Sequence, residues 1–179
     1  MKYLILLFSL WLPTGTVAQK FISELSTVTF FSKAAVEDIS ARNQKSLCLL
    51  EVATGNIAFS IPIREFQFDK SLMQEHFNEK YMETEKFPKS TFQGKLIGYS
   101  QEVKGAQPAH AQGKLTIHGV TREVDIPGTV TFDQNRMTLA SKFVVRLEDY
   151  NIQLPQILWQ NIAETIEVSL EFTLKPYEK

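Results

Sequence analysis

The sequence predicts an all-β domain, an antiparallel sandwich or barrel accompanied by one or two short helices. Two observations support this prediction. Apolar and polar residues alternate in several segments of the chain, and turn-forming residues separate these segments at short intervals. Because each segment has one apolar and one polar side, the strands are expected to share a single interior.

The N-terminus is typical of a secretory signal. Lys2 is followed by an apolar run over residues 3–12, which is too short to cross a bilayer comfortably as a helix. Proline and glycine then break the run, and small residues precede Gln19. We therefore expect residues 1–18 to be a cleaved signal peptide and residues 19–179 to form one periplasmic or secreted domain. An uncleaved anchor is the alternative.

Alternation of period two marks the expected strands, and it is strongest near the C-terminus. Turns are expected between the strands at residues 54–56, 118–119, 127–128 and 133–135. The apolar faces of the strands, in chain order, are Val28 and Phe30; Ile57, Phe59, Ile61 and Ile63; Leu115 and Ile117; Val124 and Ile126; Val130 and Phe132; Met137, Leu139, Phe143, Val145 and Leu147; and Ile166, Val168, Leu170, Phe172 and Leu174.

A helix is expected over the stretch SLMQEHFNEKY, residues 71–81. Ser71 and Gln74 fit a capping box, with the hydroxyl at the N-cap and the amide three residues later. The apolar face expected for this helix consists of Leu72, Met73, His76, Phe77 and Tyr81. A second helical or irregular segment is expected over residues 156–163.

Charge and cysteine content limit the kinds of partner and the covalent bonds that are expected. The net charge of the chain is −1, and the basic residues form no block, so nucleic acid is not an expected partner. Cys48 is the only cysteine and cannot form a disulfide within the chain. Its leucine neighbours predict a small buried apolar side chain.

The sequence offers little catalytic chemistry. His76 and Glu79 would lie on one side of a helix, but a zinc site usually needs at least three protein ligands. A serine nucleophile motif and glycine-rich phosphate loops are both absent from the sequence. We therefore expect no catalytic residue, no metal and no cofactor. A metal-dependent enzyme with a site assembled by folding is the alternative.

The thirteen phenylalanines indicate a large apolar interior. Such side chains can fill a core completely. An eight-stranded barrel, however, can also be wide enough to hold one small ligand. Composition does not distinguish the two arrangements, so a structural or interaction barrel with a filled core remains an alternative to a binding protein.

Three segments resemble the YceI family of bacterial periplasmic proteins: HFNEKYMETEKFPKSTFQGKL (76–96), GKLTIHGVTREVDIPGTVTF (113–132) and FVVRLEDYNIQLP with NIAETIEVSLEFTL (143–174). They follow the family order and cover most of residues 19–179. One departure lies near the first strand, where Ala34 and Ala35 stand close to the place of a histidine that family members often carry.

The resemblance implies a lipocalin-like antiparallel β-barrel of about eight strands with an apolar interior. It further implies a periplasmic binding or carrier protein for an isoprenoid quinone, a polyisoprenoid or a similar amphipathic lipid. Such a protein needs neither a catalytic residue nor a metal. A transient contact with a membrane and the formation of a homodimer are further possibilities.

Strand parity then predicts the site residues, because alternate side chains point into the barrel. The helix is expected to form a lid at the barrel mouth. The predicted apolar wall consists of Phe30, Phe59, Phe92, Ile117, Phe132, Leu139, Phe143, Leu170 and Phe172, and the predicted mouth or lid consists of His76, Phe77, Tyr81 and Tyr150.

Overall fold

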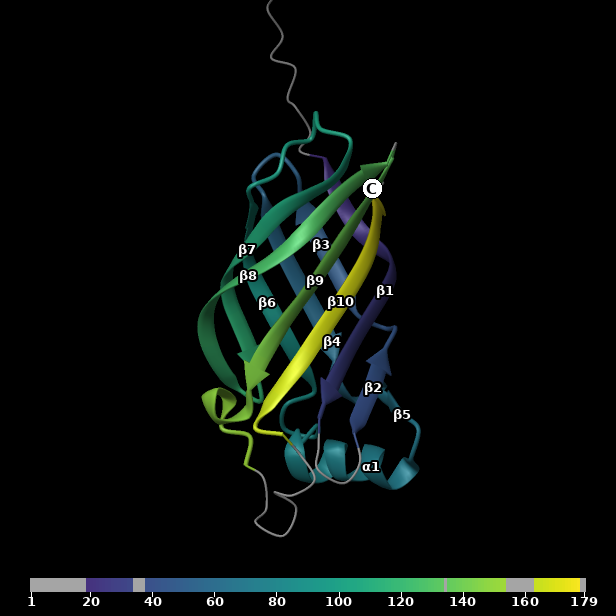
Figure 1. The fold of residues 1–179 in the computed structure, drawn as a ribbon, viewed down its shortest axis with the longest axis vertical. Coiled ribbons are helices and arrows are strands. Elements are labelled where there is room, and N and C mark those ends of the chain that lie inside the picture. The colour runs from purple at the N-terminus through teal and green to yellow at the C-terminus, as the bar shows by residue number, and fades with distance from the viewer. Residues whose placement is uncertain (1–18, 34–37, 134, 154–162, 178–179) are drawn as a thin grey trace, which may run out of the picture.

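The computed structural model describes residues 19–33, 38–133, 135–153 and 163–177. They form a closed antiparallel barrel of eight strands, with two short extra strands and one short helix (Figure 1). The elements are β1 (Lys20–Ser32), β2 (Ile39–Asn43), β3 (Leu47–Glu51), β4 (Asn56–Pro62), η1 (Ile63–Glu65), β5 (Gln67–Phe68), α1 (Ser71–His76), η2 (Phe77–Tyr81), β6 (Lys89–Ile97), β7 (Gly105–Ile117), β8 (Val120–Asp133), β9 (Arg136–Arg146), η3 (Leu147–Tyr150) and β10 (Thr165–Pro176). The predicted fold class is confirmed. The expected signal peptide and most of the expected second helix, residues 156–163, lie outside the described residues.

Neighbouring strands follow in the order β1, β3, β4, β6, β7, β8, β9 and β10, and β10 pairs with β1 to close the barrel. The two extra strands extend one side, where β2 pairs with the second half of β1 and β5 pairs with β2. Closure leaves few free strand edges, which are sites of unwanted association in open sheets.

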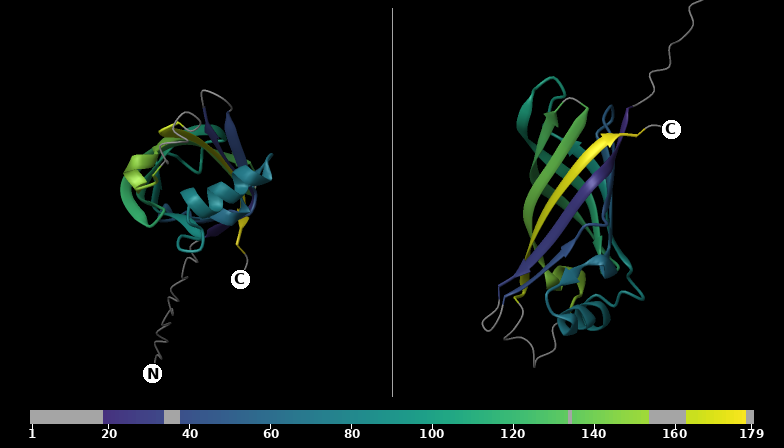
Figure 2. Two further views of the ribbon diagram at one scale, coloured as in Figure 1. Left: turned by 90° about the horizontal axis from the view of Figure 1, so that it is seen from below. Right: turned by 90° about the vertical axis from the view of Figure 1, so that its right-hand side faces the viewer.

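The two ends of the barrel differ (Figure 1). The helix end carries α1, η2, η3 and the turn at His118 and Gly119 between β7 and β8. The far end carries the turn at Gly55, the connection between β6 and β7, and the turn between β8 and β9. Seen from below, α1 lies across part of the helix end (Figure 2, left).

Two paired glycines allow β6 and β7 to approach each other closely. Gly94 of β6 and Gly113 of β7 are directly paired. A Cβ atom on either one would collide with the main chain of the neighbouring strand. Such close approach is a usual reason for glycine inside a strand at a barrel corner.

Two sequence expectations about local structure are wrong. Pro127 and Gly128 do not form a turn, because β8 runs without interruption from Val120 to Asp133. The helix does not use Ser71 as its N-cap: Lys70 occupies that position, and no side chain caps the helix. Gln74 instead accepts a hydrogen bond from the main-chain nitrogen of Phe68, at 3.5 Å.

Candidate functional site: an apolar cavity inside the barrel

The interior is densely packed at the far end. Four inward-facing side chains there are completely shielded from solvent: Leu50 of β3, Met137 of β9, and Phe172 and Leu174 of β10 are all 0% exposed. Cys48 is also buried, as predicted, and burial raises the pKa of its thiol. This part of the barrel is a filled core.

Several inward-facing side chains around the middle of the barrel are only partly buried. They pack against the core but remain half-buried, which distinguishes them from their neighbours on the same strands. On β10, for example, Leu170 and Val168 are half-buried, whereas Phe172 and Leu174 are fully buried. Phe59 and Ile61 of β4 follow the same pattern, since Ile57 of that strand is buried.

Phe59, Ile61 and Leu170, but not Val168, line a cavity of about 70 Å³. Its surface is entirely apolar, so it is a poor site for water, which needs several polar partners. Pockets for drug-sized ligands usually measure about 300–1,000 Å³. The cavity is lined by Ile57, Phe59, Ile61, Phe92, Leu96, Ala109, Ala111, Leu115, Ile126, Gly128, Thr129, Leu139, Ala140, Ser141, Phe143 and Leu170.

The predicted wall residues all lie in the barrel core or pack against it. Five of them line the cavity: Phe59, Phe92, Leu139, Phe143 and Leu170. The other four, Phe30, Ile117, Phe132 and Phe172, lie elsewhere in the interior. Prediction from apolar residues missed the opposite wall, where small residues such as Ala109, Ala111 and Gly128 leave the space that the phenylalanines do not fill.

Four phenylalanines form a cluster at the helix end. Phe77 of η2 stacks on Phe30 of β1 with 5.3 Å between the ring centroids. It also contacts Phe66 at 5.7 Å and Phe68 at 5.0 Å. Phe30 contacts the same two rings, at 5.3 and 5.6 Å. Each such pair contributes about 0.5–1.5 kcal/mol beyond its buried area, so the cluster holds the helical segment against the barrel.

The predicted mouth residues take different positions. Phe77 and Tyr81 pack against the core, and burial raises the pKa of the Tyr81 hydroxyl. Tyr150 is itself a core residue, 4% exposed. His76 is half-buried on α1. Leu72, expected on the same apolar face, is instead 60% exposed.

The helical segment also holds a buried polar group. The side-chain oxygen of Asn78, on the π-helical turn η2, is the one buried side-chain nitrogen or oxygen without a hydrogen-bond partner among the described residues. Such turns often occur at functional sites.

His118 joins three segments at the helix end. Its side chain is 10% exposed; Nε2 lies 3.1 Å from a carboxylate oxygen of Glu83, and Nδ1 lies 3.3 Å from the main-chain oxygen of Tyr150. The ring also packs edge-on against Phe87, with centroids 4.5 Å apart. Both polar partners are acceptors, so both contacts are hydrogen bonds only when the ring carries two N–H groups. From the sequence, His118 was predicted only as part of a turn.

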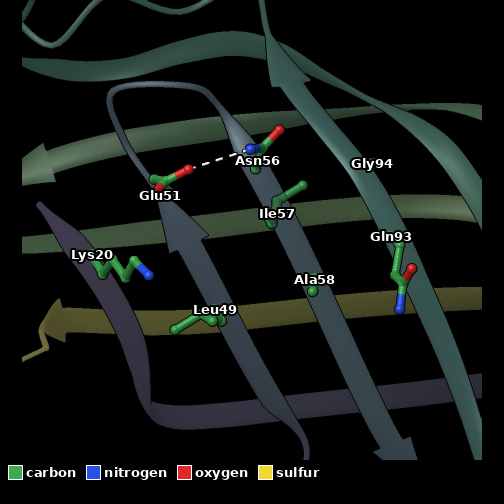
Figure 3. Close-up of a pocket in the computed structure, with 8 residues that line it drawn as sticks. All are labelled: Lys20, Leu49, Glu51, Asn56, Ile57, Ala58, Gln93 and Gly94. Carbon is green, nitrogen blue, oxygen red and sulfur yellow. Dashed lines mark hydrogen bonds between the residues drawn. The ribbon is translucent and has the colours of Figure 1, made fainter. Parts of the chain in front are cut away.

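A larger hollow of about 340 Å³ lies on the outer surface of the barrel (Figure 3). It is open to solvent and includes Lys20, Glu51 and Asn56. The Glu51 carboxylate already accepts hydrogen bonds from the side chains of Thr54 and Asn56, and these bonds lower its pKa. The hollow is therefore a less suitable ligand site than the enclosed cavity.

Neither a metal centre nor a membrane-spanning helix is evident in the described part of the chain. There, no three or more histidine, cysteine, aspartate or glutamate side chains gather into a group that could hold a metal ion. The helices found there are also too short or too polar to cross a membrane.

Comparison with known proteins identifies the family. The YceI-like domain family matches residues 19–174, and the chain therefore belongs to this family. No curated protein matches the sequence.

Several solved structures share the fold. BcnA of Burkholderia cenocepacia is 16% identical, covers 83% of this chain and 95% of its own, and has a TM-score of 0.71. A polyisoprenoid binding domain from Saccharophagus degradans, described as implicated in plant cell wall breakdown, is 14% identical, covers 88% and 98%, and has a TM-score of 0.76. The YceI protein of Campylobacter jejuni is 13% identical, covers 73% and 78%, and has a TM-score of 0.55.

Proposed function

We propose that this protein binds a polyisoprenoid or a similar amphipathic lipid, whose apolar chain occupies the barrel interior. The observation that carries this proposal is the entirely apolar cavity enclosed by the barrel. Membership of the YceI-like family and the fold shared with a polyisoprenoid binding domain support it. Binding of this kind requires no chemical step, so we further propose that the protein is not an enzyme.

Burial of the chain would supply the affinity. Each buried CH₂ group contributes roughly 0.8 kcal/mol, so about ten such groups would supply about 8 kcal/mol against association costs of about 4–15 kcal/mol. The cavity must expand to accept them, since about 70 Å³ holds only a short part of a chain. The half-buried side chains Phe59, Ile61 and Phe143 would move, because they are less tightly packed than the far end.

A carrier role in the periplasm, and a quinone as the cargo, are finer proposals. The signal-like N-terminus supports a periplasmic or secreted location. An uncharged head group is consistent with a cavity whose surface carries no polar atoms. The homodimer and the transient membrane contact remain predictions.

The direct test is native mass spectrometry of the exported protein, followed by extraction of any bound molecule into organic solvent. A stoichiometric apolar ligand is the expected result. The matched variants are Ala111→Leu, which fills the cavity, and Gln112→Leu, which adds a similar side chain at the neighbouring exposed position. Ala111→Leu is expected to abolish retention without lowering stability, whereas Gln112→Leu retains the ligand.

A barrel with a filled core is the second candidate, because the cavity is small for a ligand pocket. It predicts that the exported protein carries no ligand. It also predicts that added prenyl alcohols, quinones and fatty acids leave the protein's fluorescence unchanged. Both results together would reject lipid binding.

A further inference from the structure

The barrel wall is incomplete between β8 and β9. Within the described residues, these strands pair only from Gly128 with Ser141 to Asp133 with Arg136. By contrast, β8 pairs with β7 along nearly its whole length, and β9 pairs with β10 from Met137 to Arg146. The helix-end halves of β8 and β9, residues 120–127 and 142–146, form no ladder with each other. In Figure 1 this half of β8 bows away from β9. We call this gap the seam.

Pro127 explains where the pairing stops. The Ser141 hydroxyl donates a hydrogen bond of 2.6 Å to the Pro127 oxygen, so this oxygen faces β9. In an extended strand the nitrogen of a residue points to the same side as its oxygen. The position that should donate to β9 therefore belongs to a proline, which has no N–H.

The seam has defined limits. The hydrogen bond between Ser141 and Pro127 closes it toward the far end of the barrel. Toward the helix end, the Arg122 side chain crosses to η3 and donates to the main-chain oxygen of Asp149, at 2.9 Å. Four residues of β8 (123–126) and five of β9 (142–146) lie between these contacts, which corresponds to roughly 15 Å of strand.

The cavity lies directly behind the seam. Ile126 and Gly128 of β8 and Ser141 and Phe143 of β9 all line it, so its wall consists of residues from both sides of the gap. On the outer surface of β9, Val144 is 62% exposed. An apolar chain would thus meet Val144 outside the seam and the apolar lining of the cavity behind it.

From this geometry we infer that the seam is a lateral portal, through which the apolar chain of the ligand passes sideways between β8 and β9. The inference rests on the proposed function. It explains how a ligand reaches the cavity without displacing the phenylalanine cluster that covers the helix end. The charged residues along the gap, including Glu123, Lys142 and Arg146, discourage the two free edges from pairing with other chains.

Amide hydrogen exchange tests the seam without any ligand. The amides of residues 122–126 and 142–145 that face the gap should exchange faster than those of residues 129–133 and 136–140, where the strands are paired. Equal protection in both halves would show that the strands pair in solution, and would overturn the inference.

A disulfide across the seam tests passage of the ligand. If the register continued, Asp125 would lie opposite Val144, just as Thr131 lies opposite Thr138 in the paired half. The double variant D125C with V144C therefore closes the gap, and T131C with T138C joins the same strands where they already pair and away from the cavity lining. Both pairs occupy equivalent ladder positions. Native Cys48 is buried and should not exchange with either disulfide.

Uptake of a pyrene-labelled fatty acid would be followed by stopped-flow fluorescence, before and after reduction. Oxidised D125C/V144C should load about tenfold more slowly than its reduced form, as expected when an opening that must widen is fixed. Oxidised T131C/T138C should load at the rate of the unmodified protein. Similar rates for both oxidised variants would overturn the portal.

Pro127→Val gives an independent test, because it restores the missing N–H and needs no disulfide. It should extend the ladder and slow uptake. Unchanged uptake together with unchanged amide exchange would count against the inference that Pro127 interrupts the ladder and keeps the seam open. If the reduced and unmodified proteins bind no fatty acid or prenyl alcohol at all, the proposed function itself fails. If they bind normally and closing the seam has no effect on uptake, only the portal fails.

Discussion

The far end and the middle of the barrel interior are built differently, although the same strands run through both. At the far end Leu174 and Met137 are completely buried, and the core is filled. In the middle Leu170 and Phe143 are half-buried around a cavity. The difference shows that one alternating pattern can produce both a packed core and a ligand space, depending on which residues stand opposite.

The packed far end and the rest of the barrel have different physical roles. A packed end fixes the register of all eight strands, because a shift by one residue would expose the whole apolar face. The rest of the barrel is then free to carry less complete packing, an interrupted ladder and a helical cover. Regions that open to ligands are generally taken from the less stable parts of a protein.

The largest expected effect is on stability, and it compares two leucines of β10. Leu174→Ala should lower the free energy of unfolding by about 2–5 kcal/mol, because it leaves a cavity in a filled core. Leu170→Ala should cost about half as much, since its side chain already borders a cavity. Urea unfolding of both variants measures the difference. Equal losses would show that the two regions are packed alike.

A smaller expected effect on stability concerns the phenylalanine cluster. Phe77→Ala removes three ring contacts, each worth about 0.5–1.5 kcal/mol. Combined with Tyr81→Ala, it should release bound lipid faster while the barrel remains folded. Dissociation of a fluorescent lipid and urea unfolding would be measured together.

The control for this prediction is Leu72→Ala, which alters an exposed side chain of the adjoining helix α1. It should change neither measurement. If the Phe77 and Tyr81 variant loses stability and retention in the same proportion, the segment is structural and does not act as a cover over the cavity.

The sequence predicted the large side chains of the interior better than the small ones. Alternation placed Phe59, Leu139 and Leu170 on inward faces because their apolar character contrasts with polar neighbours. The sequence did not predict the wall at Ala109 and Ala111, because small residues contrast only weakly with polar neighbours in an alternating pattern. Whether an interior is hollow depends on which residues meet across the barrel, and one sequence does not contain that pairing.

Pro127 and Gly128 show a second limit. A proline followed by glycine usually marks a turn, and the sequence was interpreted in that way. In the structure both residues lie within β8, where the proline faces a gap in the ladder and the glycine approaches β9 closely. A Cβ atom on Gly128 would lie 2.7 Å from the main-chain oxygen of Ala140. In many proteins a proline and a glycine end a strand. In this protein they end only the pairing between β8 and β9, and β8 itself continues.

The smallest expected effect concerns acid sensitivity of the helix end. Hydrogen bonds from Lys86 and His118 hold the pKa of Glu83 below its usual value. A carboxylate with a lowered pKa stabilises the folded state above its unfolded pKa, and this contribution is lost as the pH falls through the folded pKa. Glu83→Gln should therefore reduce stability slightly at neutral pH, and the difference from the unmodified protein should shrink in acid.

Urea midpoints measured from pH 7 down to acid would follow this difference. Exposed Glu79, on the preceding helical turn, provides the matched control in Glu79→Gln, which should lack the acid-dependent change. The far end of the barrel supplies an internal comparison, because Leu174→Ala removes no charge and should cost the same at every pH where the protein folds. A constant difference for Glu83→Gln would mean that its ion pairs do not hold the turn at His118 to the barrel.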